Sequence, residues 1–225
     1  MKVPDFHIPS TLEEAEKIQK EVKEKIVLSP LSIDEIEYIA GGDAIYREGR
    51  SYSCIVLFTY PEMEIKEIRF GEERVKFPYA PGYFSFREIP PLLIALKKIS
   101  RKPDVLVLDA HGIAHPKRCG LASHLGVLLG MPTVGCAKNL LVGDYPSLPM
   151  KEGSWVYLKK GEEVLGIVLR SRENTSPIFI SPGHLTDVES ALQIILKTLK
   201  GYRIPEIIRL PHLYLRSLSQ KSSFS

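Results

Sequence analysis

The chain has 225 residues, 44% of them hydrophobic, and its 30 basic and 27 acidic residues give a formal net charge of +3. This composition allows one large domain or two small ones with a sizeable core, and it excludes wholesale disorder. The mild positive charge permits nucleic-acid binding without arguing for it. No apolar run reaches membrane-spanning length, and the charged N-terminus lacks the core of a signal peptide.

The cysteines indicate the compartment. Cys54, Cys119 and Cys136 are an odd number of residues with no CxxC spacing. We therefore expect buried free thiols in a reducing cytoplasm, and neither a disulfide framework nor a zinc site. A monomer is the default expectation.

The first third of the chain predicts one helix and an antiparallel meander. Ser10 and Thr11 stand three residues before Glu13 and Glu14, which is the capping-box spacing, so we predict a helix over 11–27 whose apolar stripe begins at Leu12. Three strand-like runs follow at 37–46, 51–60 and 63–70. The tight turns between them predict antiparallel pairing, and residues 71–74 read as a further turn.

The middle of the chain carries a strand, a polar turn, a helix and a second strand. After a proline- and aromatic-rich loop (76–84), a helix is predicted from Ser85 to about Ile99. A buried strand over 105–108 ends in Asp109, and a helix over 121–129 and a strand over 132–136 follow. This is a βαβ unit, and in open α/β sheets chemistry gathers at the carboxyl ends of such strands.

The last third adds strands and two helices. We predict strands at 154–159, 163–169 and 178–180, helices at 184–200 and 205–217, and a frayed tail over 218–225. The order βββαβαβ, with no repeat and no linker, predicts a single α/β domain over 1–225. Its core, about 37–217, is expected to be a mixed β-sheet flanked by helices.

Three acidic residues are the strongest candidates for chemistry. Asp43 follows two glycines inside a strand, Glu88 stands three residues after Ser85, and Asp109 ends a buried strand. Each has a plainer reading, as the start of a turn, a capping box or a turn cap respectively. If they converge at one sheet end, a hard divalent cation such as Mg²⁺ or Mn²⁺ would neutralise them and polarise a phosphodiester.

Other polar and aromatic residues also have two readings. Lys138, after the second parallel strand, is either a surface lysine or a phosphate contact, and His111 and His115 lie on the turn where a phosphate would sit. His124 reads as structural. His212 lies alone among apolar residues, which favours a core histidine over a ligand. The aromatics of the loop 76–84 either pack on the core or form a wedge that inserts between bases.

Five segments together resemble the endonuclease V family, repair nucleases that act beside deaminated purines. They are AGGD (40–43), FPYAPGYFSFRE (77–88), DAHGIAHPKRCGLASHLGV (109–127), PTVGCAKNLL (132–141) and SPGH (181–184). The resemblance implies a ribonuclease H-like fold. It also implies Mg²⁺-dependent or Mn²⁺-dependent cleavage of the second phosphodiester 3′ to hypoxanthine, in deoxyinosine, leaving a 3′-hydroxyl and a 5′-phosphate.

Residue by residue, the resemblance assigns roles to most of the candidates. The family's metal carboxylates fall on Asp43, Glu88 and Asp109, and its active-site lysine and late histidine fall on Lys138 and His212, which reverses the core reading of His212. His115 matches a histidine near the cut phosphate, and Tyr79 matches the wedge tyrosine. The positions around the base pocket are Gly82, Phe84, Ala110, Gly120, Leu121 and Leu141.

The sequence departs from the family pattern at three positions and leaves two other functions open. Gly42 replaces a β-branched residue, Ala80 a larger apolar residue, and Ala110 a glycine. The Ala110 methyl predicts a narrower base pocket or a changed backbone angle.

An inosine-specific endoribonuclease of the same family is the first alternative. A non-enzymatic nucleic-acid-binding module, whose carboxylates are caps, is the second.

Overall fold

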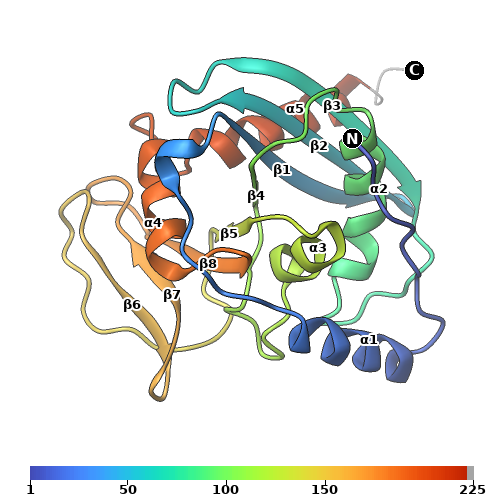
Figure 1. Ribbon diagram of the computed structural model, residues 1–225, viewed down its shortest axis with the longest axis horizontal. Coiled ribbons are helices and arrows are strands. Elements are labelled where there is room, and N and C mark those ends of the chain that lie inside the picture. Colours follow the sequence, from blue (N-terminus) through green and yellow to red (C-terminus); the bar gives the residue numbers. More distant parts are fainter. Residues whose placement is uncertain (222–225) are drawn as a thin grey trace.

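An eight-stranded mixed sheet runs through the molecule in the computed structural model, which describes residues 1–221 (Figure 1). Its strands are β1 (Tyr38–Arg47), β2 (Arg50–Thr59), β3 (Ile65–Arg74), β4 (Val105–Leu108), β5 (Thr133–Ala137), β6 (Trp155–Lys160), β7 (Glu163–Leu169) and β8 (Ile178–His184). The strand order is β3-β2-β1-β4-β5-β8-β7-β6, in which only the β1–β4 and β4–β5 pairs are parallel. The predicted combination of an antiparallel meander with a parallel βαβ unit is confirmed.

Helices cover both faces of this sheet. They are α1 (Leu12–Glu24), the short 3₁₀ helix η1 (Ile33–Glu35), α2 (Ser85–Lys97), α3 (Leu121–Leu129), α4 (Val188–Lys197) and α5 (Glu206–Lys221). Residues of α2 and α3 pack with one face of the central strands, and residues of α4 and α5 pack with the other. Within the described part of the chain, none of these helices has the length and apolar character needed to cross a membrane.

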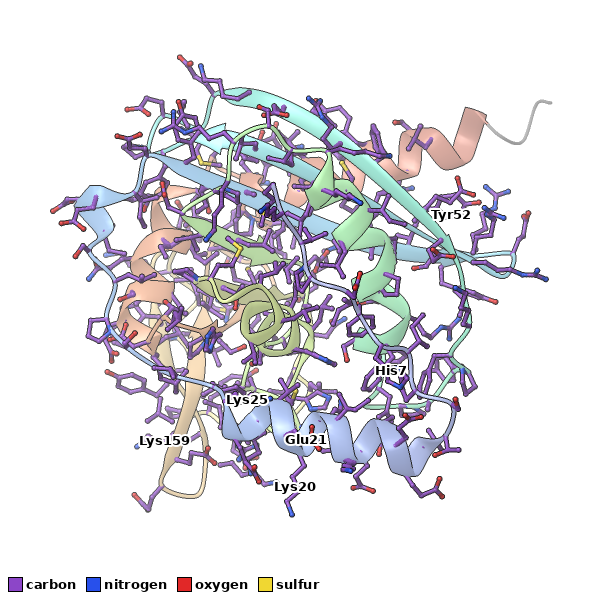
Figure 2. The ribbon with its side chains drawn as sticks, turned by 45° about the vertical axis from the view of Figure 1, so that its right-hand side comes forward. His7, Lys20, Glu21, Lys25, Tyr52 and Lys159 are labelled. Carbon is purple, nitrogen blue, oxygen red and sulfur yellow. The ribbon has the colours of Figure 1, made fainter. Side chains whose placement is uncertain are left out.

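Helix α1 lies beside α3 at one end of the molecule (Figure 1). Its N-cap is Thr11, whose hydroxyl accepts a hydrogen bond from the Glu14 amide at 3.2 Å, as the capping-box spacing predicts. Figure 2 shows Lys20 and Glu21 on the outer side of this helix. The predicted apolar stripe is wrong at its first residue, because Leu12 is 47% exposed and the helix is instead buried at Ala15 and Gln19.

Residues 71–74 form the end of strand β3, so the turn predicted there is wrong. Gly71 sits in this strand because the backbone of α2 comes close to it. A Cβ atom on Gly71 would lie 1.9 Å from the Pro91 carbonyl oxygen. The glycine therefore permits close helix–sheet packing and does not mark a turn.

Two boundaries near the C-terminus also differ from the prediction. Helix α4 begins at Val188, after the cap Asp187, whose carboxylate accepts from the Ser190 amide at 2.8 Å. His184 therefore belongs to β8 and not to a helix. Helix α5 continues to Lys221, so the tail predicted to fray from 218 is helical over 218–221, and 222–225 lie outside the described residues.

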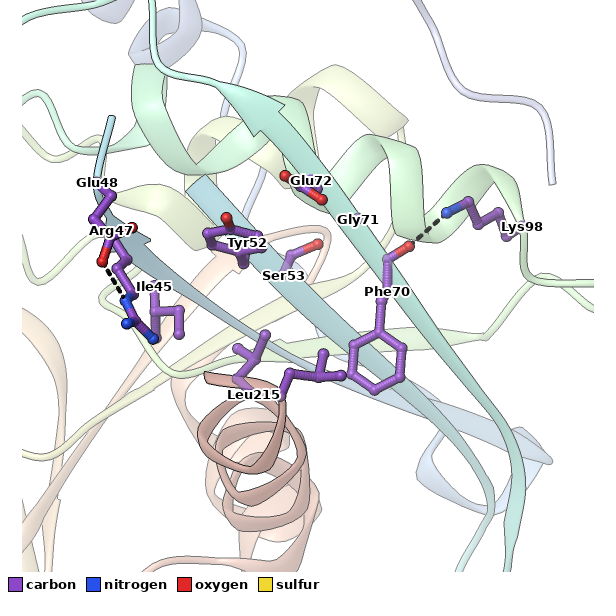
Figure 3. A pocket seen from close by; sticks show the side chains of 11 residues that line it. Ile45, Arg47, Glu48, Tyr52, Ser53, Phe70, Gly71, Glu72, Lys98 and Leu215 are labelled. Atoms are coloured by element: carbon purple, nitrogen blue, oxygen red, sulfur yellow. Dashed lines mark hydrogen bonds and ion pairs between the residues drawn. The ribbon is translucent and has the colours of Figure 1, made fainter. Parts of the chain in front are cut away.

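Helix α5 packs unusually close to β1. A Cβ atom on Gly41 would lie 1.6 Å from the carbonyl oxygen of Ile207 in α5, so only glycine fits at this crossing. Of the two adjacent glycines of β1, Gly41 therefore marks the close approach of another backbone. Further along the same face, α5 and β1–β3 enclose a pocket of about 360 Å³ that Ile45 and Leu215 help to line (Figure 3).

Candidate active site

Two carboxylates meet where β4 ends and its parallel pairing with β1 stops, part-way along β1. In the strand register Gly42 pairs with Leu108, and the Asp109 amide donates to the Gly42 carbonyl at 3.0 Å. Asp43 and Asp109 are the next residues on each strand, so the pairing of the strands places them side by side. Their carboxylates and the imidazole of His212 each offer one ligand atom, and these three atoms lie within 4.8 Å of one another.

Each aspartate also has a side-chain partner, a histidine for Asp43 and a lysine for Asp109. The Nδ1 atom of His212 lies 2.8 Å from Oδ2 of Asp43, and the Ala44 amide donates to Oδ1 of Asp43 at 2.8 Å. The Lys138 ammonium forms a short ion pair with Asp109. The Arg203 guanidinium donates to the Lys138 carbonyl at 2.8 Å, which fixes the backbone just after β5. These contacts orient the side chains toward one point at the sheet edge.

Glu88 is not part of a capping box, so that reading is wrong. Phe84 is the N-cap of α2 and makes no side-chain cap, while the hydroxyl of Ser85 lies 3.0 Å from Nδ1 of His124. Glu88 instead lines the same pocket as Asp109. Burial, and then the negative charges of Asp43 and Asp109, raise its pKa to about 8.

The pKa of Asp109 is also raised, by burial and by Asp43, in spite of the neighbouring Lys138. Carboxylates that raise one another's pKa are poised for a cation that would compensate them. The donors fit a divalent metal ion, because two carboxylate oxygens and an imidazole nitrogen converge within ligand distance. Glu88 is not one of these three ligand residues, but it is close enough for the charges of Asp43 and Asp109 to raise its pKa.

A pocket of about 400 Å³ opens onto these carboxylates. Glu88 and Asp109 form part of its wall. The wall also contains seven residues that the family resemblance placed around the base or the cut phosphate, namely Gly82, Phe84, Ala110, His115, Gly120, Leu121 and Leu141. Tyr79 is not among the lining residues, and its side chain is 70% exposed on the loop beside the pocket.

The histidines of the pocket are uncharged near neutral pH. Burial lowers the pKa of His111 and of His115 to about 4, with nearby cationic groups adding to the effect at His115. His111 lines the pocket as well. His124, predicted to be structural, is buried and bonded to Ser85, and it does not line this pocket.

Ala110 has an ordinary backbone conformation. It is not one of the residues with positive φ in the described chain, so the position needs no glycine-only angle. Its methyl group lines the pocket, and a narrower base site remains the prediction for this residue.

Two arginines near the acidic cluster have little local sequence signal. Arg203 lies in the loop before α5, where nothing in the sequence links it to Lys138. Arg87 immediately precedes Glu88 in the first turn of α2, and this adjacency is its sequence signal.

Three comparisons place the chain among known proteins. The sequence model of the endonuclease V family matches residues 20–213. Endonuclease V of Rippkaea orientalis is 41% identical over 206 residues, which are 91% of this chain and 90% of that protein.

Two solved structures of the same family are similar in fold. That of Bacillus subtilis has a TM-score of 0.90 at 32% identity, over 99% of this chain and 100% of the other. That of Ciona intestinalis, in complex with a 24mer DNA containing an inosine followed by a ribo-adenosine, has a TM-score of 0.83 at 30% identity, over 93% and 98%. The ribonuclease H-like mixed sheet expected from the sequence is confirmed by these matches.

Proposed function

The chain belongs to the endonuclease V family, and we propose from this that it nicks the second phosphodiester bond 3′ to a deaminated purine in DNA, above all hypoxanthine. Membership makes it an endonuclease and thus a phosphodiester hydrolase of DNA repair. The Ciona relative that holds inosine-containing DNA supports the choice of substrate. We propose a 3′-hydroxyl and a 5′-phosphate as the products.

The observation that carries this proposal is the juxtaposition of the acidic cluster and the pocket. Asp43, Asp109 and His212 offer ligand atoms within 4.8 Å of one another, and Asp109 and Glu88 also line the pocket of about 400 Å³. A base bound in this pocket would therefore hold the backbone of its own DNA strand beside the acidic cluster. An enzyme that cuts at a fixed distance from a recognised base needs its base pocket and its metal site to be adjacent in this way.

Mg²⁺ is the metal we propose, with Mn²⁺ able to replace it, because carboxylate oxygens are the ligands that these hard ions prefer. Asp43 and Asp109 would hold the ion directly, and Glu88 and His212 would hold it through water or place the nucleophilic water. The bound ion supplies a Lewis acid that polarises the phosphodiester and stabilises the leaving oxygen. In the metal-free protein, burial and the charges of Asp43 and Asp109 raise the pKa of Glu88 to about 8, and a bound cation would offset those charges and favour the ionised carboxylate as a ligand or base.

Other residues would bind and orient the substrate. The Lys138 ammonium, which is paired with Asp109 in the free protein, would contact the scissile phosphate, and the neutral His115 would donate a hydrogen bond to it. Tyr79, exposed on the rigid loop beside the pocket, would fill the gap left by the extruded base.

Hypoxanthine differs from adenine by a carbonyl and an N–H in place of an amine, and fixed polar groups of the pocket would discriminate between them. The wrong base would leave buried donors or acceptors unpaired. A deaminated base also pairs poorly, so its extrusion from the duplex costs less free energy than that of a normal base.

We further propose that the protein acts as a single-domain monomer in the cytoplasm. The three cysteines, Cys54, Cys119 and Cys136, are free and buried, in keeping with a reducing compartment.

A mapped cleavage assay tests the proposed function. A labelled duplex with one deoxyinosine, the same duplex with adenine, and a matched inosine RNA are incubated with Mg²⁺, and the cut is located against a ladder. The expected result is one nick at the second bond 3′ to the lesion, lost in Asp109→Asn. Full activity of that variant, or cutting of the RNA alone, would contradict the proposal. A Mn²⁺ titration separates an enzyme from a passive binding module, since only the former needs the acidic cluster to bind the ion.

A further inference from the structure

The loop 75–84 borders a second pocket, on the other side of the exposed tyrosine from the first. This open pocket of about 470 Å³ is lined by Lys76, Pro78 and Tyr79 of the loop, by Tyr46 near the end of β1, and by Arg87 of α2. None of these five residues lines the first pocket. The proposed cleavage reaction uses Tyr79 of this pocket and gives no role to Tyr46, Lys76 or Arg87.

One aromatic pair divides the two pockets. The ring centroids of Tyr79 and Phe84 are 5.3 Å apart, and Phe84 lines the first pocket while Tyr79 lines the second. Helix α2 serves both, because Glu88 lines the first and Arg87 the second. Successive helical residues point about 100° apart, which explains how neighbours on one helix reach different pockets.

Tyr46 reaches this second pocket because side chains alternate along β1. Ile45 and Arg47 face the pocket under α5 that Figure 3 shows, so Tyr46 between them points to the opposite face of the sheet. Tyr46 is 57% exposed. No packing requirement of the core accounts for a large aromatic residue there.

The chemistry of the second pocket suits a nucleotide. The Arg87 guanidinium lies 4.1 Å from the ring centroid of Tyr46 and 5.8 Å from that of Tyr79. Among the described side chains, no carboxylate lies within ion-pair distance of Arg87, so its N–H groups are available to a phosphate. Lys76 adds a second cation, held only at 4.0 Å by Glu73. Exposed aromatic rings with adjacent cations stack bases and bind their phosphates.

Building on the proposed function, we propose that this second pocket receives the nucleotide that stood opposite the lesion in the duplex. When the deaminated base enters the first pocket and Tyr79 takes its place, the opposite base loses its pairing partner. The Tyr46 ring offers that base a stacking surface next to Tyr79, and Arg87 and Lys76 lie within the same pocket for its phosphate. Tyr46 thereby becomes a binding residue for the undamaged strand.

The test compares Tyr46→Ala and Tyr46→Phe on duplexes that differ only opposite the deoxyinosine, with thymine in one and an abasic site in the other. Stacking on an aromatic side chain is worth about 1–3 kcal/mol per base, which is about a 5- to 150-fold change in Kd. We expect Tyr46→Ala to weaken binding by that factor with thymine opposite and by a factor near one with the abasic site. Tyr46→Phe keeps the ring and should bind both duplexes like the wild type.

Two controls make the result decisive. Melting curves and Mn²⁺ affinity of Tyr46→Ala verify that the fold and the acidic cluster are unchanged. Equal weakening on both duplexes would mean that Tyr46 contacts the lesion strand, and no weakening on either would mean that it contacts neither; each overturns the inference. If the wild type cuts no deoxyinosine duplex at all, the proposed function itself has failed. If the wild type cuts but the Tyr46 variants behave as in either contrary outcome, only this inference has failed.

Discussion

His212 and Asp43 are 169 positions apart in the sequence, and yet Nδ1 of the histidine lies 2.8 Å from Oδ2 of the aspartate. The contact joins α5 to β1 beside Asp109, the residue that follows β4. It exists because α5 crosses β1 at Gly41, with no side chain between the two backbones. One glycine thus sets the distance between a late histidine and an early carboxylate.

Replacement of His212 by alanine should weaken metal binding without unfolding the protein. The imidazole is partly exposed and belongs to the cluster of three ligand atoms. Loss of a group that holds or orients a metal ligand costs about 10- to 100-fold in metal affinity. Titration with Mn²⁺, followed by calorimetry or by the electron paramagnetic resonance of the free ion, measures this change. His7→Ala is the matched control, since His7 is exposed and Glu14 of α1 is its ion-pair partner among the described residues; an equal loss there would refute the assignment.

Replacement of Lys138 by alanine should separate metal binding from cleavage. Lys138 is paired with Asp109, so its removal frees that carboxylate and should leave Mn²⁺ affinity the same or higher. Cleavage should fall by about 100-fold, because a cation placed to stabilise developing charge is lost. Single-turnover rates on the deoxyinosine duplex and a parallel Mn²⁺ titration supply both quantities. Lys20→Ala, on the outer side of α1, is the control (Figure 2). A collapse of Mn²⁺ binding in Lys138→Ala would show that the lysine supports the metal site instead.

Much of the fold was predictable because local signals agreed with the final packing. The strand over 105–108 and the helix over 121–129 were predicted with the observed bounds, since an apolar run and an apolar helical pattern, each with clear turn residues, define them. The errors fell where a distant element decides. Gly71 reads as a turn residue until the backbone of Pro91 is known to lie against it.

The site was predictable only in part for the same reason. Asp109 was identifiable as a carboxylate at the end of a buried strand. The spacing of Ser85 and Glu88 favoured a capping box as much as a ligand, and only the contact of Ser85 with His124 shows that the box is not formed. His212 lies among apolar residues, and its placement depends on how α5 crosses the sheet. Sequence patterns report local structure, and this site is built from segments that meet only in the fold.

Glu88 should make the stability of the metal-free protein depend on pH. Its pKa is raised from 4.5 to about 8 in the folded state, so the folded protein binds the proton more tightly than the unfolded chain does. The stabilisation is fully present below pH 4.5 and is lost as the pH rises toward and through 8. The effect is on the order of a few kcal/mol. Melting temperatures in EDTA between pH 5 and pH 9 should fall less steeply for Glu88→Gln than for the wild type. Identical slopes for both proteins would mean that Glu88 does not hold this proton.

Replacement of Gly41 by alanine should damage the protein far more than the same change at Gly42. A Cβ atom at Gly41 would lie 1.6 Å from the Ile207 carbonyl oxygen, which is backbone and cannot move without displacing α5. At Gly42 it would meet the Cδ atoms of Ile55 and Leu108 at 2.8 Å, and such side-chain ends can turn aside. We expect Gly41→Ala to lose about 3 kcal/mol of unfolding free energy, as overpacked cores do, and Gly42→Ala to lose about 1 kcal/mol. Chemical denaturation measures both values. Since α5 also carries His212, the Mn²⁺ affinity of folded Gly41→Ala should fall as well, whereas that of Gly42→Ala should stay near the wild-type value. If Gly41→Ala is as stable as Gly42→Ala and keeps its metal affinity, the close crossing of α5 over β1 does not position the histidine.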